Sequence, residues 1–316
     1  MKSLQTKENL GLIEVVKYNP MWPKIFQDEA AKIKEALGNN CLAIHHIGST
    51  SVPGLAAKPI IDILPVVINL KDVDASNINM QKLGYEIKGE YGFMLRRFFI
   101  KENAFHVHVF EQGNPEIDRH LRFRNWMINN LEDRDAYAFL KEKLAEKYSN
   151  DRTSYCFGKD EFVANIDEKA GWHGIRIVKA LTDNEWSTLK QFREKYFHEN
   201  FQKSDPHTGL FDDPTHVHLV VLKKTDIIGY AHVQLCPDGK AVIHFIFINE
   251  KNQKQNFGSE LLIFIEKWLR SRDFKTLYSK ISPETFEFLK KHGFSDMQLN
   301  ITEGNNKERF IGKSLI

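Results

Sequence analysis

Residues 43–67 read AIHHIGSTSVPGLAAKPIIDILPVV and contain two short apolar runs joined by a turn of small residues. The run that ends at Ile47 is too short for a helix, and the run that begins at Ile60 is rich in β-branched residues, so both are predicted to be buried strands. Between them, Gly48-Ser49-Thr50 forms a tight turn, and we expect one helical turn capped by Ser51 to follow. A strand, a Gly-Ser turn and a helix start leave backbone N–H groups available to bind an anion.

Two charged residues accompany the second apolar run. Lys58 precedes it and Asp62 lies inside it. A carboxylate at this position can hold a divalent cation such as Mg²⁺ against a phosphate bound by the turn. The alternative interpretation is a structural turn, with Asp62 capping a loop. The residues alone leave both interpretations open.

The composition is that of an ordinary globular chain without a bulk charge. The 316 residues exceed one typical domain and fit two, and the formal net charge is +2. This balance gives no electrostatic drive toward nucleic acid or an anionic membrane. No segment has the apolar length of a membrane span, the first residues lack an apolar signal core, and the three cysteines are far apart. We therefore expect a cytoplasmic protein without a membrane or nucleic-acid partner.

Hydrophobic periodicity predicts alternating helices and strands around the opening stretch. Apolar positions at helical spacing favour a helix from Pro23 to Leu37, which Gly38 ends. Further helices are expected over 72–83, 120–130, 135–148 and 150–165, and strands over 12–17, 85–88, 96–100 and 105–110. This mixture predicts an α/β (α+β) domain with a mixed sheet.

The strand over 105–110 carries His106 and His108 two positions apart, so both side chains face the same side of the sheet. They are a candidate metal or phosphate pair, and a core or surface pair is the alternative. Basic residues gather nearby, and Arg97 is our candidate among them for contacting a ligand. Such clustering favours a phosphate-bearing ligand, whereas exposed arginines without a ligand are the simpler interpretation.

Several segments together resemble the GrpB family. They are YNPMWPKIFQDEAAKIKEAL from Tyr18, IHHIGSTSVPGLAAKPIIDI from Ile44, HVHVFEQG from His106 and HLRFRNWM from His120. The resemblance covers residues 12 to about 166. It implies similarity to the nucleotidyltransferase superfamily, whose members bind a nucleotide triphosphate and magnesium with a Gly-Ser turn and strand carboxylates.

By this resemblance, Gly48 and Ser49 match the superfamily's turn and Asp62 matches its first metal carboxylate. The second carboxylate is expected two residues later, where this chain has Leu64, and His108 stands near the place of a third. Two-metal phosphoryl chemistry needs anionic ligands. This departure therefore favours binding of a nucleotide or another phosphorylated ligand over nucleotidyl transfer.

The polar segment Asp167–Gly174, DEKAGWHG, marks a boundary between predicted domains at residues 1–170 and 171–316. In the second domain we expect one helix over 184–201, with Thr182 as its cap, and another over 283–292. Strands are expected over 175–178, 217–223, 227–235, 241–248 and 276–281.

The segment Val242–Trp268 combines a buried strand, a polar loop and an amphipathic helix. A loop of free N–H groups at a helix start suits a pyrophosphate, since Gly258 allows close approach and Asn256 tolerates the left-handed conformation. The pattern Gln253-x-x-Asn256-x-Gly258 resembles the acetyl-CoA loop of GNAT acetyltransferases, and the order of elements over 175–316 matches that family. The resemblance implies a splayed central sheet. The implied acetyl-CoA contacts are Phe247, Ile248, Gln253, Lys254, Gln255, Asn256, Phe257, Gly258, Ser259 and Ser282.

Two catalytic residues common among GNAT enzymes are replaced in this chain. Val242 occupies the place of the usual glutamate base, and Leu289 that of the usual tyrosine acid. His244 shares a strand face with Val242 and is the candidate base, with a buried structural histidine as the alternative. Tyr278, on the next strand, is the second catalytic candidate.

Acidic side chains in the second domain favour a cationic amine as acceptor, although solvated loop carboxylates explain them equally. They are Glu199, Asp205, Asp212 and Asp213. His216 and His218 also share a strand face, but the sequence offers no third metal ligand beside them.

These observations predict an acetyl-CoA-dependent N-acetyltransferase that acts on a small-molecule or protein amine. It is fused to a GrpB-like domain that binds a nucleotide or phosphate. One alternative is a magnesium-dependent nucleotidyl or phosphoryl transferase in the first domain. The other is a non-catalytic sensor of CoA or nucleotide.

Overall fold

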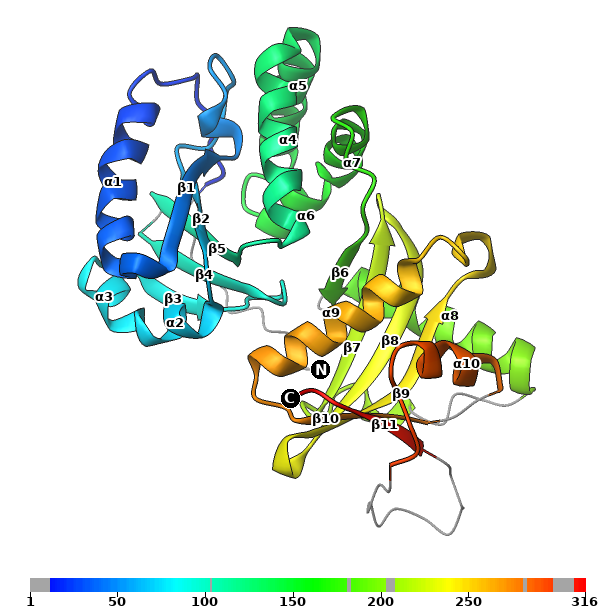
Figure 1. Ribbon diagram of the computed structural model, residues 1–316. Coiled ribbons are helices and arrows are strands. Elements are labelled where there is room, and N and C mark those ends of the chain that lie inside the picture. The colour runs from blue at the N-terminus through cyan, green and yellow to red at the C-terminus, as the bar shows by residue number, and fades with distance from the viewer. Residues whose placement is uncertain (1–11, 103, 181–182, 203–207, 281–282, 298–309) are drawn as a thin grey trace. The chain divides into compact units, whose positions relative to one another are not determined.

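The computed structural model describes residues 12–102, 104–180, 183–202, 208–280, 283–297 and 310–316 (Figure 1). The chain divides into two compact units, each with its own sheet. The first comprises Met1–Tyr91 and Leu95–Gly174, and the second comprises Gly92–Met94 and Ile175–Ile316. Among the helices within these ranges, none is long and apolar enough to cross a bilayer.

The first unit is built on a mixed five-stranded sheet with the order β1-β2-β5-β4-β3. Strands β2 and β5 run parallel, and the other neighbours run antiparallel. The strands are β1 (Cys41–Ile47), β2 (Ile61–Val67), β3 (Glu86–Gly89), β4 (Arg96–Lys101) and β5 (Phe105–Glu111). The mixed sheet confirms the predicted class of this half.

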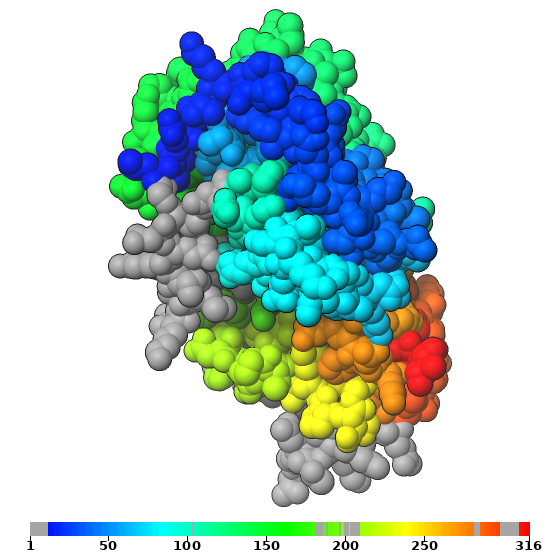
Figure 2. Space-filling model, turned by 90° about the vertical axis from the view of Figure 1, so that its left-hand side faces the viewer, coloured from blue at the N-terminus to red at the C-terminus, as the bar shows by residue number. Residues whose placement is uncertain are grey.

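Helices cover both faces of this sheet. They are α1 (Trp22–Leu37), α2 (Leu70–Ala75), α3 (Asn77–Lys82), α4 (Pro115–Asn129), α5 (Leu131–Lys147), α6 (Arg152–Phe157) and α7 (Asp160–Lys169). Helix α1 has a proline in its first turn and ends at Gly38, where φ is 58°. Its neighbours α2 and α3 share its side of the sheet, and Figure 2 shows the blue surface of α1 adjoining the lighter blue and cyan surface of the segment that follows β2.

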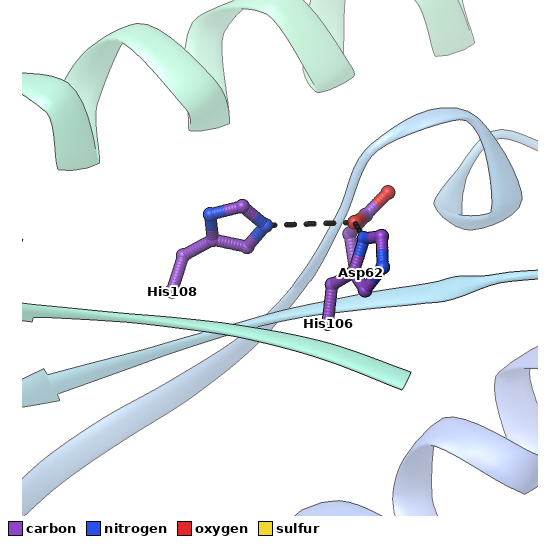
Figure 3. Close-up of side chains that lie close together, drawn as sticks. All are labelled: Asp62, His106 and His108. Atoms are coloured by element: carbon purple, nitrogen blue, oxygen red, sulfur yellow. Dashed lines mark ion pairs between the residues drawn. The ribbon is translucent and has the colours of Figure 1, made fainter. Parts of the chain in front are cut away.

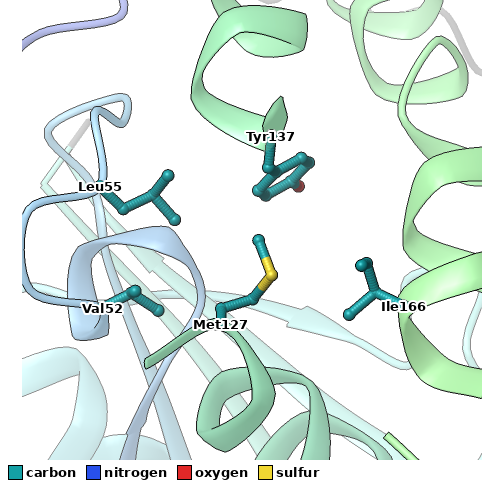
Figure 4. Packing of buried hydrophobic residues seen from close by; sticks show 5 residues of the cluster. All are labelled: Val52, Leu55, Met127, Tyr137 and Ile166. Atoms are coloured by element: carbon teal, nitrogen blue, oxygen red, sulfur yellow. The ribbon is translucent and has the colours of Figure 1, made fainter. Parts of the chain in front are cut away.

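The helices α4, α5 and α7 enclose a hydrophobic cluster with the segment after the Gly-Ser turn. Its buried members are Val52, Leu55, Met127, Tyr137 and Ile166 (Figure 4). Val52 and Leu55 therefore anchor the small-residue segment between β1 and β2 by burying apolar side chains. This anchoring fixes the turn from Gly48 to Ser51 relative to the sheet.

The helix expected over 150–165 is interrupted at Gly158 and Lys159 and forms α6 and α7. Three further local predictions for the first unit are wrong. Residues 12–17 form no strand, because only Val16 pairs, with Ala57, while the Ile13 amide bonds to the carbonyl of Ser149. The helix predicted over 72–83 is interrupted at Ser76 and forms α2 and α3.

The third concerns the turn after β1. Ser51 caps no following helix, because Ser49–Ser51 is itself a 3₁₀ turn and the Ser51 hydroxyl donates back to the Gly48 carbonyl at 2.6 Å.

The second unit contains a six-stranded sheet with the order β11-β10-β9-β8-β7-β6. Strands β9 and β10 run parallel, and the other neighbours run antiparallel. The strands are β6 (Arg176–Lys179), β7 (His216–Lys223), β8 (Asp226–Cys236), β9 (Lys240–Ile248), β10 (Thr276–Lys280) and β11 (Phe310–Ser314), and the helices are α8 (Asp183–Phe201), α9 (Phe257–Ser271) and α10 (Pro283–Lys291).

Strand β9 separates from β10 halfway along its length. The pairing runs from Lys240, opposite Thr276, to Ile243, opposite Ser279, and does not continue to Ile248. The register between β9 and β8 also shifts at this point, so that His244 is an extra residue on β9. The splayed central sheet expected for this half is confirmed.

Strand β11 was not expected from the sequence. Its centre is Gly312, and glycine weakens strand propensity. The structure gives the reason for this glycine, because a Cβ atom there would lie only 2.9 Å from the ring of Tyr278.

Candidate functional site

A cavity of about 1320 Å³ lies in the second unit where β9 leaves β10. It is bounded by the last residues of β9, the loop that follows, and the starts of α9 and α10. The lining residues are Phe192, Lys195, Ile227, Ile246, Phe247, Ile248, Asn249, Glu250, Lys251, Asn252, Gln253, Lys254, Asn256, Gly258, Ser259, Thr285 and Phe288. Seven of the ten cofactor residues named from the sequence are in this lining.

The loop before α9 presents backbone N–H groups to this cavity. Asn256 precedes the helix in the left-handed conformation, with φ 69°, and its side chain makes no cap. The first N–H groups of a helix have no intrahelical acceptor and lie at the positive end of the helix dipole. The start of α9 is therefore available to bind an anion.

Three lysines and one glutamate line the cavity, so its lining carries a net positive charge. The lysines are Lys195, Lys251 and Lys254, and the acid is Glu250. A Cβ atom on Gly258 would meet Phe288 at 3.6 Å and Ile248 at 3.9 Å, which are ordinary contacts. A glycine is therefore not required at this position for the fold, and its missing side chain leaves space in the cavity.

Two predicted cofactor residues lie outside the lining, and a third is not described. Gln255 accepts a hydrogen bond from Lys223 at 3.4 Å outside the lining, and Phe257 is buried as the first residue of α9. Ser282 lies outside the described residues. Gln253 does line the cavity, and it also makes a hydrogen bond within the protein. Its side-chain amide donates to the Ile248 carbonyl at 2.9 Å.

The two catalytic candidates do not line the cavity. Tyr278 is buried in β10. His244 is half-buried on the sheet face that α8 covers, two residues before Ile246, which does line the cavity. Its Nε2 atom lies 2.7 Å from Oε1 of Gln234.

His244 belongs to a cluster of imidazoles. The sequence predicted only that two of its members, His216 and His218, share a strand face. His216 Nδ1 lies 2.7 Å from His232 Nε2, and the His232 and His244 rings are 5.0 Å apart. His218 Nδ1 lies 2.6 Å from the hydroxyl of Tyr230. His216 and His218 thus belong to a buried hydrogen-bonded array.

The acidic residues expected near an acceptor are only partly described. Asp205 and the side chain of Glu199 lie outside the described residues. Asp212 is exposed, and Asp213 accepts from the amide and hydroxyl of Thr215 at 2.8 Å and 2.7 Å. Asp213 therefore stabilises its own loop.

A second constellation lies in the first unit, where the parallel register of β2 and β5 sets Asp62 opposite His106. Oδ1 of Asp62 is 3.4 Å from Nδ1 of His106 and 3.5 Å from Nε2 of His108. Figure 3 shows the imidazoles of His106 and His108, from alternate positions of β5, beside the carboxylate of Asp62. The face shared by His106 and His108 is therefore the face of Asp62.

The carboxylate of Asp62 is held in its ionised form. Burial raises its pKa, but hydrogen bonding from His106 and His108 outweighs burial and holds the pKa well below its usual value. Gly48 is required beside it, because φ is 70° there and a Cβ atom would lie 2.3 Å from Asp62 Oδ2.

Arg97, the arginine selected from the sequence, is not part of this constellation. It lies on the opposite face of β4, where it donates to both carboxylate oxygens of Asp74 at 2.6 Å and 2.7 Å. Its neighbour Arg96 is the residue that reaches the site, with Nη1 3.2 Å from Nδ1 of His108. Alternation along β4 identifies the correct arginine only once the register with β5 is known.

Two lysines, Lys58 half-buried and Lys141 buried, stand on the α5–α6 side of the turn. Burial and the nearby Arg152 lower the pKa of Lys58 to about 8, and its Nζ lies 5.1 Å above the ring of Tyr155. Burial also lowers the pKa of Lys141 to about 7, and this lysine donates to the Ala56 carbonyl. Sequence analysis missed Lys141, since its helical position looks like an ordinary surface lysine.

Known proteins resemble the two halves separately. Residues 12–169 match the family model described as GrpB protein. The chain belongs to the GrpB family. Residues 181–294 match the acetyltransferase (GNAT) family, so the second half is a GNAT domain.

Curated relatives match the GrpB domain. The chain is 42% identical over 168 residues to UPF0157 protein BH1888 of Halalkalibacterium halodurans, which covers 52% of this chain and 86% of that protein. It is 34% identical over 168 residues to the glutamate-rich protein GrpB of Alkalihalophilus pseudofirmus, covering 50% and 95%. UPF0157 protein YqkA of Bacillus subtilis is 41% identical over 161 residues, and this chain spans only 47% of its length.

Two solved structures are each similar to a part of the chain. A GrpB protein from Enterococcus faecalis is 40% identical, with a TM-score of 0.48, and the match covers 50% of this chain and 96% of that one. A GNAT-family acetyltransferase from Staphylococcus aureus is 12% identical, with a TM-score of 0.41, and the match covers 45% and 100%.

The GrpB domain does not offer the ligands that magnesium prefers. Mg²⁺ takes oxygen ligands in octahedral geometry, whereas Asp62 is accompanied by two imidazoles. Leu64, at the position of the second carboxylate, is fully buried among Ile47, Val66 and Phe110. The residues present therefore do not fit a magnesium centre.

Replacing Lys141 with methionine is expected to flatten the rise of unfolding free energy between about pH 7 and pH 10. In the folded protein Lys141 loses its proton above its lowered pKa of about 7, whereas in the unfolded chain the lysine keeps that proton up to about pH 10.4. Stability linked to this group therefore increases with pH across that window, by at most about 1.4 kcal/mol per pH unit. Denaturant unfolding at several pH values measures the slope.

The matched control is Lys143→Met, because Lys143 is exposed on the same helix. Its profile should follow that of the wild type. Parallel profiles for the wild type and Lys141→Met would show that burial does not shift the proton affinity of Lys141.

Proposed function

We propose that the GNAT domain transfers the acetyl group of acetyl-CoA to an amine of a small molecule or a protein. The observation that carries the proposal is the cavity at the point where β9 leaves β10, with the uncapped start of α9 at its edge. This combination supplies an anion site and a stretch of β9 that β10 does not cover within one cavity. A ligand with a pyrophosphate at one end and an extended amide arm would use both.

In this proposal the backbone N–H groups from Phe257 to Ser259 bind the pyrophosphate of acetyl-CoA. The lysines that line the cavity, Lys251 and Lys254 among them, add charge complementarity. The β9 edge beyond Ile243 pairs with the extended arm. The thioester is then directed toward the middle of β9.

We assign His244 as the base that accepts the proton of the acceptor amine. Because Gln234 presents its carbonyl oxygen to Nε2, that nitrogen carries the ring proton, and the basic nitrogen of the neutral ring is Nδ1. The amine nitrogen would bond to the thioester carbon as His244 takes its proton, the C–S bond would break, and the departing thiolate would take a proton from water. His244 stands on the same strand as the cavity residue Ile246, which gives the assignment its geometric support.

Replacing Gly258 with alanine is expected to weaken acetyl-CoA binding about tenfold or more, which is about 1.4 kcal/mol. The added methyl group makes only ordinary contacts with Phe288 and Ile248, so the fold should be retained. It would, however, occupy the space through which a pyrophosphate approaches the backbone. Isothermal titration of the full chain with acetyl-CoA measures the affinity.

Ile263→Ala is the control, because Ile263 is exposed on α9 and is not part of the cavity lining. A saturating ligand at a hundred times its Kd should stabilise the wild type by about 2.7 kcal/mol. No stabilisation of the wild type by acetyl-CoA would overturn the proposal.

The variant His244→Gln is expected to bind acetyl-CoA normally and to lose about 10²–10⁴-fold in kcat, the usual contribution of general-base catalysis. The reason is that a glutamine side chain cannot accept the amine proton. Steady-state kinetics over a panel of amines, with acetyl-CoA affinity measured in parallel, separates the two effects. An unchanged kcat would show that His244 is a structural histidine.

We further propose that the GrpB domain binds a phosphorylated small molecule. The observation that favours it is the gathering of three lysines beside the Gly-Ser turn: Lys58 and Lys159 lie over the ring of Tyr155, and Lys141 lies over the ring of Tyr137. Crowded cations repel one another, and a bound anion removes that cost. Nucleotidyl transfer has less support, since Leu64 replaces the second carboxylate.

Replacing Lys58 with methionine is expected to weaken binding of pyrophosphate and ADP about tenfold or more, tested without magnesium. Binding to the wild type should weaken above pH 8, because Lys58 with a pKa of about 8 loses its charge there. Calorimetric titration across pH 6–9 measures both effects, with the exposed Lys143→Met as control. Equal binding by wild type and Lys58→Met would contradict the role of Lys58.

A further inference from the structure

We propose that Asp62, His106 and His108 form a binding site for one divalent transition-metal ion of the Zn²⁺ class. The GrpB domain holds these three side chains on one face of its sheet, and their ligand atoms all lie within 4.8 Å of one another. Among the described residues, no other group of three histidine, cysteine or carboxylate side chains brings its ligand atoms this close together. The inference is independent of acetyl transfer by the GNAT domain.

The two distances from Asp62 to the imidazoles fit a tetrahedral ion. Ligand atoms bound at roughly 2.0–2.2 Å around a tetrahedral centre lie roughly 3.3–3.6 Å from one another. Oδ1 of Asp62 lies 3.4 Å from His106 Nδ1 and 3.5 Å from His108 Nε2. An ion between these atoms therefore requires only small shifts of the Asp62 carboxylate relative to each imidazole, which Figure 3 shows gathered on one side of the sheet.

The backbone makes this arrangement rigid before any ion binds. Asp62 and His106 occupy paired positions of the parallel strands β2 and β5, and His108 is paired with Phe98 of β4. Sites built on strands hold their geometry better than sites built on loops. The side chains retain access, since Asp62, His106 and His108 expose 28%, 12% and 17% of their side-chain surfaces.

The ligand types select the class of metal. Imidazole nitrogen suits Zn²⁺, Fe²⁺, Co²⁺ and Ni²⁺, whereas Mg²⁺ and Ca²⁺ are bound through oxygen. Two imidazoles and one carboxylate leave at least one coordination position for water or a substrate, which is the pattern of catalytic rather than structural zinc sites. The site is thus expected to bind an exogenous ligand at the ion.

Arg96 is hydrogen-bonded to His108, one of the three candidate ligands. Its guanidinium has no acceptor, so His108 Nδ1 must accept its hydrogen bond, which leaves the ring proton on Nε2, facing Asp62. A metal ion on Nε2 displaces that proton, and a neutral ring then carries a proton on Nδ1, opposite Arg96. Arg96 therefore acts against metal binding, whereas a carbonyl in its place would accept the Nδ1 proton and favour the ion.

The experiment is calorimetric and native mass-spectrometric titration of the chelator-treated full chain with ZnCl₂, CoCl₂ and MgCl₂. One Zn²⁺ or Co²⁺ per GrpB domain is expected, with at least about hundredfold weaker binding of Mg²⁺. The variants Asp62→Asn and His108→Gln should each lose this ion. Arg96→Gln should bind it about 10–100-fold more tightly, the range typical of changes in the groups that contact metal ligands.

The control is His292→Gln, a histidine of the GNAT domain outside the constellation, which should bind as the wild type does. If His108→Gln fails to fold, the visible spectrum of Co²⁺ bound to the wild type provides the second measurement, because a tetrahedral nitrogen–oxygen site gives intense d–d bands. Equal affinity for Zn²⁺ and Mg²⁺, an unchanged affinity in Asp62→Asn, or weaker binding in Arg96→Gln would each overturn the proposal.

Discussion

Each half of this chain is organised around one pair of parallel strands. In the GrpB domain β2 and β5 run parallel, and in the GNAT domain β9 and β10 do so, whereas the other described neighbours are antiparallel. A parallel pair requires a crossover connection, which brings a loop or helix across the sheet. Each candidate site lies at such a pair, where the register places side chains or leaves a strand edge open.

The two sites use this constraint differently. In the GrpB domain β2 and β5 pair without a register shift. This pairing places a carboxylate beside two imidazoles and leaves these side chains little freedom to move. In the GNAT domain the pairing stops at Ile243, and the interruption itself creates the cavity. The first arrangement favours binding of a compact ion or group, and the second favours an extended ligand.

The sequence was sufficient for those features that depend on local pattern. Alternation along β5 predicted that His106 and His108 share a face, and the loop before α9 was recognised from Asn256 and Gly258. Features that depend on register or on distant packing could not be read in the same way. Arg97 was chosen over Arg96 because two adjacent arginines differ only in the face they occupy, and Lys141 was missed because its burial comes from the segment at Ala56. Strand β11 was missed because the glycine that accommodates Tyr278 lowers its strand propensity.

The hydrogen bond from the Gln253 side chain to the Ile248 carbonyl has a consequence for how a ligand gains affinity. That carbonyl lies on the strand edge where an extended amide arm would pair, so the ligand must exchange one hydrogen bond for another. Such an exchange contributes little net free energy. The selectivity of the cavity then resides in the charged end of the ligand, and a short acyl thioester that lacks phosphates would be a poor substrate however well its arm fits.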